Sequence, residues 1–179
     1  MVLGIKELHN LVKEKKLVEN LSERELTNPE GAGFDFRLGK VHEISGEAYL
    51  GIDARKTTEI DTVLEYNDKE VQIFTLQPGA QVLVTTLERV NLPKNLTANF
   101  WARGTLYRNG IILSGGNVAP GYEGELSFTL FNSSKCAMKI EMGARIIHVQ
   151  FFEVQGEGNA YRGQWKGGRI NVTTLEKQV

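Results

Sequence analysis

Cysteine is nearly absent from this sequence, and neither sign of charge is in surplus. The single cysteine, Cys136, excludes a disulfide framework within the chain. Lysine and arginine together number 21 against 22 acidic residues, and the formal net charge is −1. Proteins that bind a nucleic-acid backbone usually carry a basic surplus, so we expect no nucleic-acid partner.

Long apolar runs and targeting segments are also missing. No run is long enough to span a membrane, and the N-terminus has no secretory pattern. We therefore expect a cytoplasmic protein with no membrane partner.

Two families of nucleotide and metal motifs are missing as well. His9, His42 and His148 are widely separated, and no Cys-x-x-Cys pair accompanies them, which excludes the site of the zinc-dependent deaminases. No glycine-rich motif of the P-loop or Rossmann type opens a helix. We expect no metal ligands from the protein itself.

What is present indicates one mainly β domain. A chain of 179 residues with 41% hydrophobic residues is long enough to bury a substantial core. An N-terminal amphipathic helix is predicted, because Ile5, Leu8, Leu11 and Val12 recur at helical spacing. After Pro29 the sequence contains short β-branched or aromatic runs bounded by glycine or proline. These predicted strands lie at residues 71–74, 82–84, 111–113, 126–131 and 146–152. Such a pattern predicts a barrel or jelly roll rather than a parallel α/β fold.

Residues 103–108, which we call the clamp segment, predict an anion site. Arg103 and Arg108 each offer a planar fork of donors suited to phosphate oxygens. Gly104 lets the backbone approach a ligand closely, and Thr105 adds a hydroxyl. The alternative is a pair of surface arginines that form ordinary salt bridges.

The composition changes at about Gln155, and we treat residues 1–154 as the domain and 155–179 as a tail. The tail is rich in glycine, asparagine, lysine and arginine, which is typical of a frayed terminus. It also carries a dense group of aromatic, amide and cationic side chains, which would suit a segment that orders over a ligand. These are Tyr161, Arg162, Gln164, Trp165 and Lys166.

Six segments in this order resemble the trimeric dUTPase and dCTP deaminase superfamily. They are GAGFDFRLG (31–39), LQPGAQVLVTTLERVNLP (76–93), ARGTLYRNGI (102–111), APGYEGEL (119–126), EMGARIIHVQF (141–151) and AYRGQWKGG (160–168). The N-terminal helix and the first and last segments are more similar to the dCTP deaminase branch, which includes the archaeal-type dUTPases. The resemblance implies a distorted β-barrel of the β-clip type, assembled as a homotrimer. It also implies a deoxynucleoside triphosphate ligand whose phosphates carry Mg²⁺ without protein ligands.

The same resemblance assigns site residues. Triphosphate binding would fall to Arg103, Gly104, Thr105 and Arg108. The base and sugar would lie against Asn117, Val118, Ala119, Tyr122, Ser127, Phe128, Thr129 and His148. The tail residues Tyr161, Arg162, Gln164 and Lys166 would cover the nucleotide as a lid.

The chain departs from the family pattern at the catalytic positions. Ala119 stands where dUTPases carry an aspartate, and Thr129 stands where deaminases carry a glutamate. A methyl group cannot accept a proton, and a neutral hydroxyl is a poor general base at neutral pH. Gly104 and His148 replace a second hydroxyl residue and a glutamine that the family often has.

Two residues are candidate replacements for the missing acids. Glu125, Ser127 and Thr129 point to one face of a strand, because side chains alternate, so Glu125 is a candidate if that face is the pocket. His148 has an unperturbed pKa suited to proton transfer. The alternatives are that Glu125 is a solvated strand residue and that His148 is a packed or hydrogen-bonded core residue.

Three functions follow from these residues and remain open. The first is a hydrolase that converts dCTP to dUTP, or dUTP to dUMP and diphosphate. The second is a catalytically silent relative that binds a nucleotide and acts as a regulator or an assembly component. The third uses only the β scaffold, for protein contacts.

Overall fold

The described residues of this computed structural model, 1–156 and 158–178, form a mainly β structure with three short helices. The helices are α1 (Ile5–Lys15), α2 (Glu23–Thr27) and α3 (Gly104–Arg108). The strands of the large sheet are β1 (Val18–Glu19), β2 (Phe34–Ser45), β5 (Glu59–Glu65), β7 (Gln81–Asn91), β8 (Leu96–Ala102), β9 (Ile111–Ser114), β10 (Asn117–Val118), β11 (Glu123–Asn132) and β13 (Arg145–Glu153). The smaller sheets contain β3 (Tyr49–Leu50), β4 (Ala54–Lys56), β6 (Ile73–Leu76), β12 (Met138–Glu141) and β14 (Glu176–Lys177).

The N-terminal helix forms where the apolar spacing predicts it. Leu8 is its buried anchor, while Ile5, Leu11 and Val12 pack against the core at its edge. Lys16 ends α1 in the left-handed region, with φ 52°, and its N–H donates to the carbonyls of the last turn. This is a common way of ending a helix and satisfying its free carbonyls.

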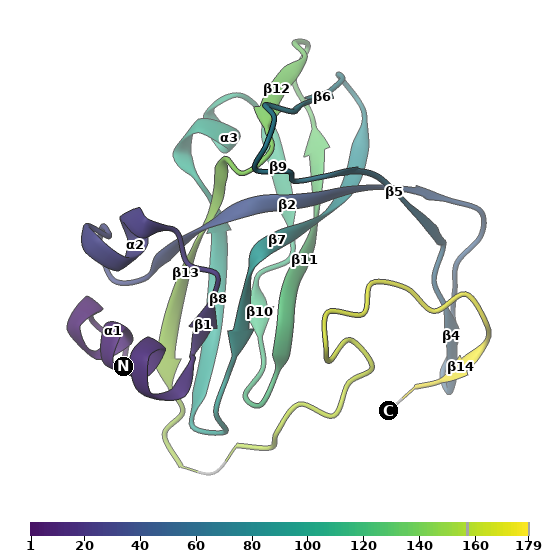
Figure 1. Cartoon of the computed structure of the whole chain (residues 1–179). Helices are drawn as coiled ribbons and strands as arrows, with labels where there is room; N and C mark the ends of the chain where they lie inside the picture. Colours follow the sequence, from purple (N-terminus) through teal and green to yellow (C-terminus); the bar gives the residue numbers. More distant parts are fainter. Residues whose placement is uncertain (157, 179) are drawn as a thin grey trace.

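The large sheet is antiparallel and has the strand order β10-β8-β13-β2-β7-β11-β9, with β5 added along β2 and β1 along β7. Figure 1 shows this sheet curled into a half-barrel, with α1 and α2 at one end and β4 with β14 at the opposite end. No helix among the described residues is long and apolar enough to cross a membrane.

The core lies inside the curl of the sheet. Phe34, Phe36 and Phe151 are fully buried there, and the rings of Phe34 and Phe151 meet edge to face at 6.3 Å. Alternate residues of β11 are buried, as expected for a strand with one face on the core. The mainly β prediction is therefore confirmed.

The predicted strands agree with the structure in most cases. The runs at 82–84, 111–113, 126–131 and 146–152 lie within β7, β9, β11 and β13. The run at 71–74 is displaced, because β6 begins at Ile73, where pairing with β12 begins. Strands β2, β5 and β8 of the large sheet are among those outside the predicted runs. β5 has polar or acidic residues at many positions and an exposed face, so its apolar pattern is weak.

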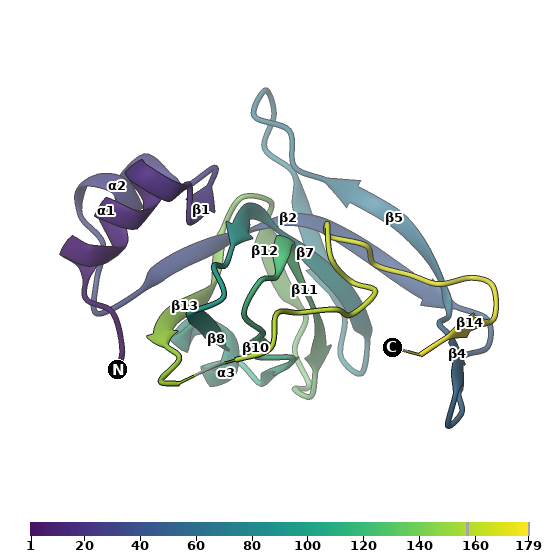
Figure 2. The same cartoon turned by 90° about the horizontal axis from the view of Figure 1, so that it is seen from below.

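The tail crosses the open side of the sheet. Figures 1 and 2 both show it leaving the end of β13 and running to β14, which pairs with β4. The predicted tail, residues 155–179, includes residues 157 and 179, which lie outside the described residues.

A buried ion pair joins β2 to β7. The carboxylate of Glu88 is fully buried and accepts hydrogen bonds from the backbone N–H of Arg37 (2.7 Å) and from its Nε (2.6 Å). The same guanidinium donates to the carbonyl of Asn20 (2.5 Å). Burial raises the pKa of Glu88, although Arg37 acts in the opposite direction. Glu88 thus depends on Arg37 to remain charged inside the fold.

Loss of this arginine is expected to destabilise the protein strongly. Arg37→Met would leave a buried carboxylate without its partner, and we expect the free energy of unfolding to fall by about 3 kcal/mol. Lys40→Met is the control, because Lys40 forms an exposed pair with Glu65 (2.7 Å) on the same strand β2. We expect that substitution to cost less than about 1 kcal/mol. Urea denaturation measures both.

The double variant Arg37→Met/Glu88→Met distinguishes the cost of losing the ion pair from the cost of leaving the Glu88 carboxylate buried without a partner. Because it removes both charges, we expect it to recover much of the stability that Arg37→Met loses. Equal stability of Arg37→Met and the wild type would contradict this account.

Candidate functional site

The clamp segment begins at the end of β8 and forms the short helix α3. Leu106 is its buried anchor, and the N–H of Arg103 donates to the carbonyl of Ile146 on β13 (2.9 Å). Thr105 and Arg108 are exposed on its outer side. Among the described residues, no carboxylate lies within salt-bridge distance of Arg108. Its guanidinium is thus available to an anion.

Arg103, in contrast, points inward to a buried carboxylate. It pairs with Asp35 on β2, which is 3% exposed and also accepts from Nη1 of Arg145 (3.0 Å). The N–H of Asp35 donates to the buried Glu25 (3.0 Å), and Arg24 pairs with Glu25 (2.5 Å). Burial lowers the pKa of Arg103, and the positive charges of Arg145 and Arg24 lower it further. Arg24, Arg103 and Arg145 face the carboxylates of Glu25, Glu30 and Asp35, so the charges of this cluster are balanced.

His148 belongs to this arginine cluster. Its Nδ1 lies 2.9 Å from the Asp35 carboxylate, and burial lowers its pKa. His148 therefore lies beside Arg103 within the chain. It does not line the cavity formed by the 117–127 region. This position follows from the pairing of His148 with Asp35 across β13 and β2.

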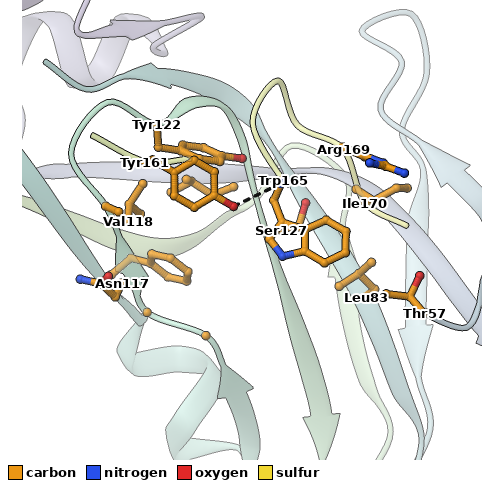
Figure 3. Close-up of a pocket in the computed structure, with 15 residues that line it drawn as sticks. Thr57, Leu83, Asn117, Val118, Tyr122, Ser127, Tyr161, Trp165, Arg169 and Ile170 are labelled. Carbon is orange, nitrogen blue, oxygen red and sulfur yellow. Dashed lines mark hydrogen bonds between the residues drawn. The ribbon is translucent and has the colours of Figure 1, made fainter. Parts of the chain in front are cut away.

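That cavity, which we call the main cavity, has a volume of about 420 Å³. Five of the residues predicted for the base and sugar line it: Asn117, Val118, Ala119, Tyr122 and Ser127. The wall also includes residues of β4–β5, β7, β8 and β11 that the sequence analysis missed. These are Thr57, Leu83, Phe100 and Leu126. In the view of Figure 3, Asn117 and Arg169 lie at opposite ends of the cavity.

The other predicted wall residues, Phe128 and Thr129, do not line the main cavity. Phe128 is buried and packs behind the wall against Phe100, with ring centroids 5.2 Å apart. Thr129 pairs in register with Leu83 and Ser114 farther along the sheet. Phe128 thus supports the cavity from the core.

Aromatic side chains dominate one side of the main cavity. The rings of Tyr122 and Tyr161 meet edge to face at 5.4 Å, and the N–H of Trp165 donates to the Tyr161 hydroxyl (3.2 Å; Figure 3). The hydroxyl of Tyr122 donates to the carbonyl of Glu125 (2.7 Å), and burial raises its pKa to about 12. Tyr122 is therefore a neutral wall residue and not a base.

The tail is fastened to this wall by backbone hydrogen bonds. The N–H of Tyr161 donates to the carbonyl of Pro120, and that of Gly167 to the carbonyl of Glu123, both at 2.6 Å. Arg55 stacks on Trp165 at 4.3 Å. Tyr161, Trp165, Arg169 and Ile170 from the tail line the cavity.

The remaining predicted lid residues do not line the cavity, and two of them hold the tail in place. Gln164 donates to the carbonyl of Lys177 (2.5 Å), Lys166 pairs with Glu123 (3.6 Å), and Arg162 is exposed. Arg169, which the sequence analysis did not select, lines the cavity instead. The sequence offers one indication of Arg169: it is the next cationic residue after Lys166 in the same tail.

Glu125 faces a different cavity. A β-bulge between Glu125 and Ser127 interrupts the pairing of β11 with β7. Ser127 lines the main cavity, whereas Glu125 lines a neighbouring cavity of about 410 Å³, together with His42 and Thr85. The Glu125 carboxylate lies 3.7 Å from Arg89. Burial along β11 alternates without interruption and the extra residues of the bulge belong to β7, so Glu125 and Ser127 share one face of the strand, as predicted.

One chain does not bring the clamp segment and the main cavity together. None of Arg103, Gly104, Thr105 and Arg108 lines it. Large apolar side chains beside the clamp segment are exposed, among them Trp101 (51%), Tyr107 (58%) and Ile112 (53%). In the described part of the chain, no group of three or more His, Cys, Asp or Glu side chains is arranged to hold a metal ion.

A single methyl group is expected to detach the tail. A Cβ on Gly124 would overlap the backbone N of Gly168 in the tail, and the backbone cannot yield as a flexible side chain does. Gly124→Ala should therefore expose Trp165. In a Trp101→Phe background, where Trp165 is the remaining tryptophan, we expect its fluorescence to shift to the red.

Gly116→Ala is the matched control for this variant. Gly116 has φ 148° against 144° for Gly124, so both substitutions carry the same backbone strain. The nearest atom to a Cβ on Gly116 is the carbonyl oxygen of Phe100 at 3.5 Å, which is an ordinary contact. The same red shift in both variants would show that strain in the strand, not contact with the tail, is responsible.

Comparisons with known proteins agree with the six segments. A family model described as dCTP deaminase-like matches residues 2–154. The chain is 31% identical over 168 residues to a dCTP deaminase of Thermococcus kodakarensis, across 93% of this chain and 96% of that protein. It is 32% identical over 159 residues to a dUMP-forming dCTP deaminase of Dictyoglomus turgidum. That match covers 86% of this chain and 81% of the other protein. The crystal structure of a 2′-deoxycytidine 5′-triphosphate deaminase of Agrobacterium tumefaciens matches with a TM-score of 0.63 at 15% identity. That match spans 84% of this chain and 47% of the other.

Proposed function

This chain belongs to the dCTP deaminase-like family, and we propose that it binds dCTP in the main cavity and hydrolyses its amino group to give dUTP and ammonia. The observation that carries the proposal is the position of the turn at residues 119–122, which we call the base-site turn. Ala119 and Tyr122 form a wall of the main cavity, and the aromatic tail closes over it. A planar pyrimidine fits an aromatic wall of this kind.

The polar groups of the main cavity suit a base and a sugar. Asn117 offers an amide that both donates and accepts, and Ser127 offers a hydroxyl. Arg169 brings a positive charge to the opposite end, although it also pairs with Glu176 (2.8 Å). When the nucleotide is bound, Mg²⁺ would neutralise part of the triphosphate charge, held by phosphate oxygens rather than by the protein.

The triphosphate would be bound by the clamp segment of a second copy of the chain. Arg108 is exposed and unpaired among the described residues, and the adjacent Trp101, Tyr107 and Ile112 form an exposed apolar surface suited to contact between copies. Because the clamp segment and the main cavity are separate in one chain, a homotrimer in which neighbours complete each site fits the geometry.

A silent nucleotide-binding protein is the second candidate function. No carboxylate lines the main cavity in the described part of the chain, and the catalytic positions of the family hold Ala119 and Thr129. The aromatic wall and the clamp segment would still bind a nucleotide without converting it.

Incubation of the protein with dCTP and Mg²⁺, with products resolved by chromatography, tests the proposal. We expect dUTP and ammonia from dCTP, and parallel reactions with dUTP and the other deoxynucleoside triphosphates establish specificity. Release of dUMP would extend the reaction to phosphate cleavage. Tight binding of dCTP without any product would identify the silent alternative.

Arg108 variants test the phosphate role. Arg108→Ala is expected to weaken dCTP binding by about 10- to 100-fold, because charge-assisted hydrogen bonds are lost. Arg108→Lys keeps the charge but loses the planar fork, so we expect an intermediate affinity. Lys6→Ala, on the exposed side of α1, is the control. Titration calorimetry gives the affinities, and wild-type binding by Arg108→Ala would exclude the clamp segment from the site.

Complementation tests the shared site. Arg108→Ala removes the clamp, and Ser127→Phe fills the main cavity, so each variant alone is expected to be inactive. Co-expressed copies form sites in which the clamp of one variant meets the intact cavity of the other. We expect turnover to return in this mixture. If each site lay within one chain, the mixture would stay inactive.

A further inference from the structure

Four neighbouring strands each contribute one polar side chain to a continuous row. The row is Thr62 on β5, His42 on β2, Thr85 on β7 and Ser127 on β11. Nδ1 of His42 lies 2.9 Å from Oγ1 of Thr62, and Nε2 lies 2.9 Å from Oγ1 of Thr85. The row continues from Thr85 Oγ1 to Ser127 Oγ at 3.4 Å.

The two ends of the row differ in their surroundings. Ser127 opens into the main cavity, where the pyrimidine would lie. His42 and Thr85 are buried, with 1% and 5% exposure, and Thr62 is exposed. His42, Thr62 and Thr85 line the neighbouring cavity of about 410 Å³, which also contains Glu125. The row therefore connects the main cavity to a second, polar cavity across four neighbouring strands of the sheet.

The pairing of the strands explains this arrangement. Ser127 lies opposite Thr85, and His42 lies opposite Thr62, each in an antiparallel pair. Residues opposite one another on one face are close enough for their side chains to touch. Glu125 and Ser127 lie on the same face of β11, where Ser127 lines the main cavity and Glu125, two residues before it, lines the neighbouring cavity.

The row can move a proton in either direction. A neutral imidazole has one N–H and one acceptor nitrogen, and each hydroxyl can donate and accept at once. With the proton on Nδ1, Thr85 donates to Nε2 and Ser127 donates to Thr85, so Ser127 accepts from the cavity. With the proton on Nε2, all the bonds reverse and Ser127 donates into the cavity. Burial lowers the pKa of His42, and the positive charge of Lys40 lowers it further. The neutral ring therefore predominates at neutral pH.

We propose that this row is the proton relay of the site, replacing the carboxylates absent at Ala119 and Thr129. The inference rests on the proposed function. As the attacking water bonds to C4 of the cytosine, it loses a proton to Ser127, and the chain of hydroxyls delivers a proton to Nε2 of His42. The relay then runs backwards, and Ser127 donates to the amino group. The C4–N bond breaks, and its electron pair leaves with ammonia. The remaining proton of the water passes to N3, so that dCTP and water give dUTP and ammonia.

The other titratable groups are less well placed for this role. His148 is bound to Asp35 beside Arg103, and Glu125 faces the neighbouring cavity. The Tyr122 hydroxyl already donates a hydrogen bond to the backbone carbonyl of Glu125. Among the described residues that line the main cavity, Ser127 has a hydroxyl that leads through hydrogen bonds to a titratable ring.

Three conservative variants interrupt the relay at successive points: Ser127→Ala, Thr85→Val and His42→Asn. Thr85→Val keeps the shape of the side chain and removes only the hydroxyl. For Thr85→Val and His42→Asn we expect kcat for dCTP to fall about 100-fold or more, the usual range for loss of general acid–base catalysis. KM and the affinity for dCTP should change by less than about 3-fold, since neither residue lines the main cavity.

A double variant and a neighbour control distinguish a relay from a structural role. Thr85→Val/His42→Asn should be no slower than the slower single variant, because both act in one chain of transfers. Thr86→Val is the control. Thr86 is equally buried on the same strand, but its hydroxyl bonds to the carbonyl of Glu88 and the N–H of Leu126. We expect that variant to lose stability and keep its kcat.

The outcomes separate the relay from the function on which it rests. Wild-type turnover together with unchanged kcat in Thr85→Val and His42→Asn would overturn the relay alone. A fall in kcat that Thr86→Val matches would also overturn it, because any buried hydroxyl would then have the same effect. No product from the wild-type protein with any nucleotide would overturn the proposed function, and the relay with it.

Discussion

The buried carboxylate of Asp35 is the interaction on which the arrangement of this site depends. A carboxylate removed from water is stable only when cations and hydrogen-bond donors surround it. Arg103, Arg145 and His148 supply them, and in doing so they join the start of α3 to β13 and β2. Glu25 accepts the N–H of the same residue and draws in α2. One buried charge therefore positions the segment that we propose binds phosphate.

The tail is held by interactions of a different kind. At the main cavity, the N–H groups of Tyr161 and Gly167 donate to backbone carbonyls, and aromatic contacts add to these bonds. Farther along the tail, the buried Val172 forms hydrogen bonds with Thr57, and β14 pairs with β4. The tail is therefore fastened on both sides of the segment that lines the main cavity.

The loss of both familiar acids changes how catalysis would have to work in this chain. Ala119 offers no side-chain acceptor, and Thr129 does not line the main cavity. The row from Ser127 to His42 is the arrangement in this structure that reaches from the cavity to a titratable group. A neutral imidazole inside the sheet would serve as both acceptor and donor, tasks for which a carboxylate is usually used.

The sequence alone determined the kind of fold. The helix at Ile5–Lys15 and strands such as β11 and β13 follow from local apolar spacing, and the order of the six segments indicated the family. Five of the eight predicted wall residues lie together because they occupy one continuous stretch around the base-site turn. Only the tertiary structure decided that Glu125 and Ser127 face different cavities, that His148 belongs with Asp35, and that His42 meets Thr85. Periodicity records which face of its own strand a residue occupies, whereas these contacts depend on strand register and on the path of the tail, which arise only when distant segments pair.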